Sequence, residues 1–423
     1  MASTKFAHPT PFLVTASPRL EPPSPLSCKH IYQHHTNTHT SIPAMSSLYG
    51  VIERANKASL LDEYARLWKL FIEGIDEVVG YVREEDCMKI QWDVKWFHCE
   101  TVNKKGDEVR RITIVRSNNY LAADGISHIP SPAEACKIAF QKLLAANANK
   151  FPAFSLWKVT EEADQEYCPI HLADPGVNVL PLRIPLPLRG VLGVLTVGVH
   201  LNVYRVKEKD GKETIDQIWV SHRSKDPNYS YPGMLDQIVA GGADTNDTID
   251  GQLAPCKTLA REAREEAGLT IDHQTRQVFF EEMGGDDGDN KKKMRIHVGT
   301  VERASSITFF DFKDESAGDL YNKHLEPGLR IVYDLKITNP SFRPKKMESA
   351  IERFEPMGVP QVTESLNSNR WKPNCGLVML DFMVRHGLVT KHDESRFERI
   401  KKDLRRPLCF AFLTELHRIT KGW

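Results

Sequence analysis

Hydrophobic positions in the first part of the chain follow two periods, one typical of helices and one typical of strands. Helical spacing runs over residues 60–72 and 132–147, and strand-like alternation runs over residues 78–82 and 110–115. A helix repeats its buried face about every 3.6 residues, whereas a strand repeats it every second residue. The pattern therefore predicts a small module of mixed helices and strands.

After residue 190 the apolar segments become richer in β-branched side chains, which favours strands. Residues 185–190 are predicted to form a linker or a crossover ahead of them, and Lys209-Asp-Gly211 is predicted to turn between the first two strands. Strands are predicted over residues 191–205, 217–222, 235–240, 276–282, 306–312 and 330–337, and closing helices over residues 377–386 and 394–404.

One further helix is predicted between the third and fourth of these strands. Pro255 suits its first turn, and Gly268 suits the position just past its end. An apolar side is formed by Leu259, Ala263 and Ala267, which recur every four residues. The helix is therefore expected to pack against the core along one narrow face.

The acids of this helix point away from that apolar face. Glu262, Glu265 and Glu266 have the spacing i, i+3, i+4, and like charges at such spacings cost roughly 0.2–0.5 kcal/mol per pair. They also lie near the C-terminal end of the helix, where the macrodipole disfavours anions. A divalent cation reverses this cost, because Mg²⁺ binds carboxylate oxygens together with water and phosphate oxygens. The three acids are therefore predicted metal ligands.

Composition and charge limit the classes of function. The 423 residues contain 56 Lys and Arg and 56 Asp and Glu, so the formal net charge is zero. The overall charge therefore does not favour binding to nucleic acid or to a membrane surface. The eight cysteines form no C-x-x-C pair, which argues against a zinc ribbon or a disulfide scaffold. No apolar run reaches about 18 residues, so a transmembrane helix is not expected.

The first 44 residues differ from the rest of the chain. They are rich in Pro, Ser, Thr and His and almost free of acids, which predicts a disordered leader. Arg19 is the single arginine in this segment, whereas a mitochondrial transit peptide usually contains several. A cytoplasmic location is the first hypothesis, mitochondrial import is the second, and a translation start at Met45 is a further alternative. The predicted organisation is a leader (1–44), an α+β domain (46–189) and a larger domain (190–423).

The segment from Arg261 to Leu269 resembles the signature of the Nudix hydrolases. That signature contains Arg-Glu-apolar-x-Glu-Glu-x-Gly-apolar, and this sequence matches it at every fixed position. The resemblance implies an α/β/α sandwich with a mixed sheet, and hydrolysis of a small-molecule diphosphate. It also implies that Mg²⁺, or Mn²⁺ as an alternative, is bound by Glu262, Glu265 and Glu266, with Arg261 in the catalytic group.

The loop ahead of the helix departs from the same signature. The usual glutamate position holds Leu253, and the usual leading glycine position holds Asp247. Gly241 and Gly242 are predicted to turn the chain out of the preceding strand and to form part of the substrate-binding loop. This loop is longer than is usual in the family.

A narrower resemblance covers residues 60–410. The strings at 195–204, 231–242 and 371–375 are similar to the fungal and plant Nudix subgroup labelled thiamine pyrophosphokinase-related. That resemblance implies hydrolysis of oxidised or damaged thiamine diphosphate analogues to the monophosphate. Arg223 and Lys225 are predicted to bind the terminal phosphate, although a solvated surface role is an equal alternative for both.

The subgroup usually carries another glutamate in a later loop, where this chain has Ala350. Glu348 and Glu352 are two candidates to replace it, and a site that uses the helix acids alone is the third alternative. Two alternatives to the thiamine hypothesis stay open: hydrolysis of another diphosphate such as a dinucleotide, ADP-ribose or CoA, and a ligand-binding protein that has lost catalysis. His200 and His222 resemble catalytic bases, but a hydrogen-bonded structural role is favoured for each.

Overall fold

A computed structural model of the chain describes most residues from 47 onwards. The described ranges are 47–58, 66–104, 107–116, 129–157, 166–173, 182–283, 293–416 and 422–423. Residues from Ser46 to Trp423 belong to one compact unit. The predicted leader, residues 1–44, lies outside the described ranges.

The first sheet is small and contains both parallel and antiparallel pairs. Its strand order is β2-β1-β4-β3, with β1 parallel to β4 and the other pairs antiparallel. A helix with a Ser131–Glu134 capping box, α3, packs on its core. The elements of this region are β1 (Trp68–Ile72), β2 (Ile75–Val82), α2 (Glu84–Lys89), β3 (Phe97–Lys104), β4 (Asp107–Ile114), α3 (Pro132–Asn147), β5 (Tyr167–Pro169), β6 (Arg183–Pro185) and α4 (Leu186–Arg189).

Two sequence-based predictions in this region are wrong. Residues 68–72 form strand β1 rather than the end of a helix, because Leu70 and Ile72 are buried in pairings with β2 and β4. The predicted start of that helix, residues 60–65, lies outside the described ranges. Residues 185–190 are not an open linker, since β6 runs directly into the helical turn α4. The predicted helix at 132–147 is confirmed.

The second sheet is large and mixed. In the described part of the chain its order is β13-β14-β15-β16-β7-β8-β17, with β10 beside β7 and β9 beside β8. Only the central pair β7–β16 is parallel among the pairings described. Its strands are β7 (Thr196–Lys209), β8 (Lys212–Arg223), β9 (Leu235–Asp236), β10 (Val239–Gly242), β13 (Leu269–Ile271), β14 (Gln277–Met283), β15 (Lys293–Phe312), β16 (Leu325–Lys336) and β17 (Ile351–Met357).

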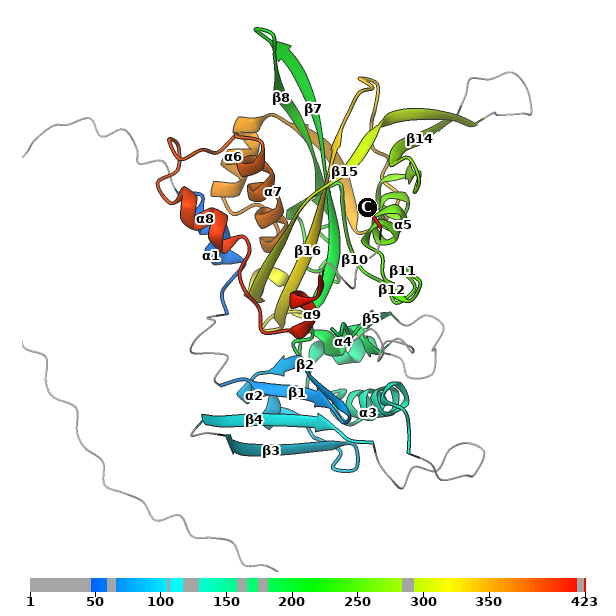
Figure 1. Cartoon of the computed structure of the whole chain (residues 1–423), viewed down its shortest axis with the longest axis vertical. Helices are drawn as coiled ribbons and strands as arrows, with labels where there is room; N and C mark the ends of the chain where they lie inside the picture. Colours follow the sequence, from blue (N-terminus) through cyan, green and yellow to red (C-terminus); the bar gives the residue numbers. More distant parts are fainter. Residues whose placement is uncertain are drawn as a thin grey trace, which may run out of the picture. The chain divides into compact units, whose positions relative to one another are not determined.

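Helices cover both faces of this large sheet (Figure 1). The acidic helix α5 (Pro255–Ala267) packs on one face through Leu259, Ala263 and Ala267. The opposite face is covered by a separate core. Helices on that side are α1 (Tyr49–Arg54), α6 (Val359–Asn367), α7 (Pro373–Arg385) and α8 (Phe397–Asp403), and α9 (Ala411–Thr414) lies near the chain end.

The predicted α+β class with a mixed sheet between helices is confirmed. The predicted domain boundary near residue 190 stays a prediction. Residues before that boundary do not all pack together, because Val51 and Ile52 of α1 belong to the same core as α7. A hydrogen bond also crosses the boundary, because the backbone N–H of Tyr81 in β2 donates to Leu192 O at 2.9 Å.

Candidate functional site

The acidic helix begins and ends where the sequence predicts. Pro255 occupies its first turn, and Gly268 adopts φ 66° at its C-terminus, a left-handed conformation that glycine adopts without steric cost. The burial of Leu259 and Ala263 fixes the rotation of the helix about its axis. That rotation turns the acids towards the edge of strand β10.

Glu262 lies directly over the backbone of Gly241. A Cβ atom added at Gly241 would lie 1.8 Å from the Glu262 Cδ atom, so any side chain at residue 241 excludes the observed position of the carboxylate. Gly241 and Gly242 are themselves part of strand β10, paired with β7. The prediction that they turn the chain into a loop is therefore wrong, because their backbone continues the sheet.

Arg261 connects the acids to the loop that precedes the helix. Its Nη1 donates to Glu262 Oε1 at 2.8 Å and to Glu265 Oε2, four residues further along the helix, at 3.1 Å. Its Nη2 donates to Gly242 O and to Asp247 Oδ2, both at 2.8 Å. One guanidinium thus fixes two helix acids and both ends of one loop segment.

Glu266 is fixed from below by the sheet. Its Oε2 accepts a hydrogen bond from Ala240 N at 2.8 Å. Burial and the neighbouring charge of Glu262 raise the pKa of Glu266 well above its usual range. A carboxyl group in such surroundings needs a proton or a cation nearby.

Burial also raises the pKa of Glu262 to about 7, against the lowering effect of Arg261. Glu265 and Glu348 add to the increase because their negative charges lie close to Glu262. Mutual repulsion among buried carboxylates is the electrostatic condition that a divalent cation relieves.

Glu348 is the later glutamate that joins this cluster. The segment that carries it is attached to the end of α5, since Lys345 N donates to Ala267 O at 3.3 Å and Met347 N donates to Glu266 O at 3.2 Å. Glu348 then lines the same pocket as Glu262 and Glu265. The other candidate, Glu352, pairs with Arg353 at 3.4 Å and lies 3.9 Å from Lys225.

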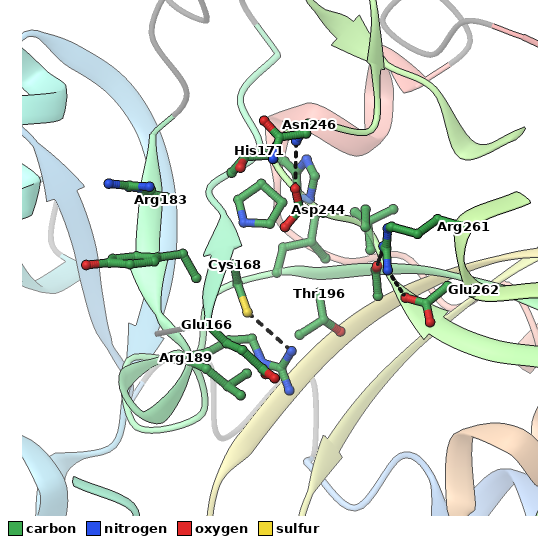
Figure 2. A pocket seen from close by; sticks show the side chains of 18 of the residues that line it. Glu166, Cys168, His171, Arg183, Arg189, Thr196, Asp244, Asn246, Arg261 and Glu262 are labelled. Carbon is green, nitrogen blue, oxygen red and sulfur yellow. Dashed lines mark hydrogen bonds and ion pairs between the residues drawn. The ribbon is translucent and has the colours of Figure 1, made fainter. Parts of the chain in front are cut away.

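The pocket in front of the acids has a volume of about 650 Å³. Its opposite wall comes from β5, β6 and α4, which precede the large sheet in the chain. Figure 2 shows Arg183 and Arg189 across the pocket from Arg261 and Glu262. His171 also lines the pocket, and burial lowers its pKa to about 4, so its ring is neutral at physiological pH.

These two arginines are held by the wall itself. The guanidinium of Arg183 lies 4.2 Å from the centroid of the Tyr167 ring, and Arg189 donates to Cys168 Sγ at 3.5 Å. Glu166 lies beside them in the lining. A cationic wall faces an anionic wall across a space that a diphosphate and a divalent ion would fill together.

The predicted phosphate ligands Arg223 and Lys225 lie outside the residues that line this pocket. Arg223 donates to Ser230 O at 2.9 Å and to Asp236 Oδ2 at 3.1 Å. The Lys225 side chain is 77% exposed. Their role in substrate binding stays a prediction, whereas Gly242 does line the pocket.

A second group of side chains that could bind a metal ion is buried on the other face of the sheet. Ligand atoms of His200, Asp236 and Cys375 lie within 4.8 Å of one another. Asp236 already contacts two cations, Arg223 at 3.1 Å and Lys372 at 3.7 Å, and a third positive charge beside them is unfavourable. His200 is hydrogen-bonded to Gln237 at 2.8 Å. The group is therefore a hydrogen-bonded core cluster, and the structural role favoured for His200 agrees with this.

The helix acids, by contrast, fit a magnesium-type ion. Glu262, Glu265, Glu266 and Glu348 supply only oxygen donors, and hard divalent cations prefer carboxylate oxygens. Glu262, Glu265 and Glu348 share the lining of the pocket, and Glu266 is hydrogen-bonded to Ala240 N.

Several site residues were not identified from the sequence. Asp247 pairs with Arg261, and Glu166, Arg183 and Arg189 form the opposite wall. Among these residues, the sequence draws attention only to Asp247, since it lies in the loop that departs from the family signature. The wall residues are separated from α5 by more than sixty positions and stand in no recognisable motif.

None of the helices in the described part of the chain combines the length and the apolar character that crossing a lipid bilayer requires.

Comparison with known proteins gives relatives of modest similarity. Protein YJR142W of Saccharomyces cerevisiae is 28% identical over 241 residues, which cover 56% of this chain and 60% of that protein. Nudix hydrolase 20, chloroplastic, of Arabidopsis thaliana is 29% identical over 208 residues, 49% of this chain and 43% of the relative. Nudix hydrolase 24, chloroplastic, of the same plant is 26% identical over 49% of this chain and 44% of its own length.

The chain thus spans about half the length of the relatives it matches. Among solved structures, an Ap4A hydrolase of C. elegans is 13% identical with a TM-score of 0.25, covering 45% of this chain and 96% of that one. No protein-family model matches the chain.

Proposed function

We propose that this protein is a metal-dependent hydrolase of the Nudix family that cleaves a diphosphate linked to an organic group. The observation that carries the proposal is the joint position of Glu262, Glu265 and Glu348 on one wall of a pocket of about 650 Å³. Glu266 is buried, and it lies close enough to Glu262 for the charge of that residue to raise its pKa further. Similarity to two plant Nudix hydrolases supports the same chemistry.

Each residue has a distinct part in this proposal. The four glutamates would hold Mg²⁺ or Mn²⁺. When bound, such an ion neutralises phosphate charge and lowers the pKa of an attacking water. The Glu265 side chain is 41% accessible, against 11% for that of Glu262, which suits Glu265 to orient that water. Arg261 holds Glu262 and Glu265 at fixed positions and is a positioning residue.

The opposite wall would bind the phosphates. Arg183 and Arg189 face the acids, and a guanidinium binds phosphate oxygens through two parallel N–H groups. Substrate held between this wall and α5 brings its diphosphate to the carboxylate cluster. Fixing both ends of a substrate in this way lowers the entropic part of the barrier.

The preferred substrate in this proposal is an oxidised or otherwise damaged analogue of thiamine diphosphate, which would yield the monophosphate and phosphate. Support comes from the strings at residues 195–204, 231–242 and 371–375, which are similar to the thiamine pyrophosphokinase-related subgroup.

Product release by the purified chain tests the proposal directly. Thiamine diphosphate, its oxo and oxy analogues, ADP-ribose, NADH and CoA are each offered with Mg²⁺. Turnover is expected to fall at least ~100-fold in Glu265→Gln, the low end for loss of a group that acts on the attacking water. Glu398→Gln, which changes a side chain that is 79% exposed, is the matched control.

The pattern of turnover separates the hypotheses. Preference for the damaged thiamine forms supports the full proposal. Turnover of a nucleotide alone keeps the hydrolase and removes the thiamine substrate. Absence of turnover with every diphosphate, together with an unchanged fold, would favour a ligand-binding protein.

A further inference from the structure

A second cavity opens beside the main pocket. Its volume is about 270 Å³, and it shares Glu166, Leu186 and Arg189 with the lining of the main pocket. The shared residues make the two spaces neighbours with a common border. A single ligand long enough to cross that border would occupy both.

The second cavity combines aromatic and aliphatic side chains with a group of charged ones. Trp157 and Tyr321 supply its aromatic surfaces, and Leu186, Pro187 and Leu325 supply aliphatic ones. The Trp157 ring meets the Tyr167 ring edge-to-face, with centroids 5.3 Å apart and an interplanar angle of 89°. Since Tyr167 lines the main pocket, this aromatic pair forms part of the border between the two spaces.

The polar groups of this cavity gather on the wall that contains Lys313, His324 and Glu326. Lys313 is buried and pairs with Glu326 at 3.0 Å, and Glu326 also accepts from Arg330 at 2.7 Å. His324 is buried beside them, and Leu325 N donates to Gly190 O at 2.9 Å, which attaches this wall to the segment after α4. Apolar surfaces with a few convergent polar groups are typical of small-molecule sites.

We propose that this second cavity binds a planar, nitrogen-containing aromatic ring of the substrate, whose diphosphate lies in the main pocket. Trp157 and Tyr321 would contact the faces of the ring, and the polar groups near Lys313 would contact its edge. Arg189, which lines both spaces, would bind the substrate where ring and phosphates meet. This assignment deepens the proposed function and rests on it for the identity of the ligand.

The geometry favours a ring over a flexible chain. Aromatic side chains bind flat rings through stacked or edge-to-face contacts, and they lose little conformational freedom on binding. The cavity volume is close to the lower limit of about 300 Å³ for small-ligand pockets, so a ring system of one or two rings fits it. Glu326 in this wall is paired with Lys313 and Arg330, so these two cations are already neutralised within the protein.

Equilibrium binding, without turnover, tests the assignment. Thiamine monophosphate, AMP and inorganic diphosphate are titrated calorimetrically into the full chain with Mg²⁺. Trp157→Ala is expected to weaken binding of at least one organic monophosphate by roughly 5- to 100-fold, the range found when an aromatic stacking partner is removed. The affinity of Trp157→Ala for inorganic diphosphate is expected to stay within about twofold of that of the unmodified protein, because this ligand has no ring.

Matched variants separate ligand contact from folding. Trp92→Ala removes a tryptophan that is also partly buried against the same core as Trp157 but lines neither cavity. It is expected to bind all three ligands normally. Trp157→Phe is expected to restore most of the lost affinity. Should Trp157→Ala fail to fold, Tyr321→Ala provides the same test from the other aromatic surface.

The assignment would be overturned if Trp157→Ala weakened the binding of organic and inorganic ligands equally, or weakened neither. It would also be overturned if the unmodified protein bound inorganic diphosphate more tightly than both organic ligands. Failure of the hydrolase proposal looks different. In that case organic monophosphates bind through Trp157, yet no diphosphate is cleaved. Cleavage with no differential effect of Trp157→Ala would overturn the ring cavity alone.

Discussion

A missing side chain determines where the first carboxylate of the site lies. Gly241 leaves the space that the Glu262 carboxylate fills, as the 1.8 Å approach to an added Cβ demonstrates. We expect Gly241→Ala to displace Glu262 and to lower kcat/KM by ~100-fold, equivalent to about 2.7 kcal/mol of transition-state stabilisation. Turnover and Mn²⁺ affinity measure the effect.

The neighbouring Gly242 supplies the comparison for this variant. No heavy atom lies within 4 Å of an added Cβ at Gly242, so Gly242→Ala is expected to lose much less activity. Equal losses in the two variants would show that the effect comes from glycine replacement in β10 as such, and not from the displacement of Glu262.

Protonation of Glu262 links metal binding to pH. Burial raises its pKa to about 7, so in the metal-free protein the folded state binds a proton that the unfolded state releases near pH 4.5. The contribution of Glu262 to stability is therefore fully present below that lower pH and is lost as the pH rises through about 7, by roughly 3 kcal/mol at most. The Tm measured in EDTA should fall between pH 5 and pH 8.

Two comparisons accompany this pH series. Mg²⁺ should restore the Tm at pH 8, because a cation stabilises the ionised carboxylates. Glu262→Gln should weaken the dependence on pH in EDTA. A Tm that stays constant from pH 5 to pH 8 in EDTA would contradict the raised pKa.

At the scale of the element, helix α5 carries the site because its apolar side fits the sheet. Leu259 is fully buried in the core between α5 and the large sheet. Leu259→Ala is expected to lower the free energy of unfolding by about 2–5 kcal/mol, measured by urea denaturation. Lys257, exposed on the same helix, is the control, and Lys257→Ala should change stability by less than about 0.5 kcal/mol.

This helix is also the element that the sequence predicts best. Pro255, Gly268 and the four-residue apolar repeat act locally, so a linear pattern is enough to locate them. The same is true of α3, where Pro132 follows the capping residue Ser131. The acid cluster could be predicted for a similar reason, since its members lie within five positions of one another.

Strand β1 illustrates the opposite case. Trp68 to Ile72 contains apolar residues at spacings that fit either a helix or a strand, and the backbone hydrogen bonds of β2 and β4 decide between them. β2 follows β1 directly, but β4 is distant in sequence, since Lys69 pairs with Arg111, so the local pattern alone favours the wrong element. Gly241 and Gly242 were misassigned for the same reason, because pairing with β7 keeps them extended.

At the scale of the whole molecule, the pocket exists because distant segments meet. Glu166, Arg183 and Arg189 precede the large sheet, whereas the acids follow its first strands and Glu348 follows its last but one. No local period in the sequence connects these segments. Their convergence is a property of the tertiary packing, which explains why one wall of the site was predicted and the other was not.

The junction between the two sheets can be tested through a single glycine. Gly193 has φ +53°, and an added Cβ would lie 2.2 Å from Tyr81 O of strand β2. We expect Gly193→Ala to lower the free energy of unfolding by about 1–3 kcal/mol and to raise KM, because the wall that carries Arg189 shifts. Urea denaturation and steady-state kinetics measure the two effects.

Gly211 separates the effect of contact from that of backbone strain. It has a similar φ, +71°, with no atom within 4 Å of an added Cβ. Gly211→Ala should therefore show the cost of the left-handed backbone without any change in KM. A KM that is equally unaffected in Gly193→Ala would contradict the proposed coupling between this junction and the pocket.

The loop between Gly242 and Pro255 has its own small hairpin, β11 (Thr248–Ile249) with β12 (Gln252–Leu253), which turns at Asp250 and Gly251. Ala254 N donates to Asp247 O at 2.8 Å and closes the base of the hairpin, and the Asp247 carboxylate fixes that base to Arg261. Residues added at the tip would lengthen the hairpin without moving its base. This loop is therefore a suitable place to insert a fluorophore-binding peptide or an affinity tag. For the same reason, related chains can differ in length here while keeping α5 in register with β10.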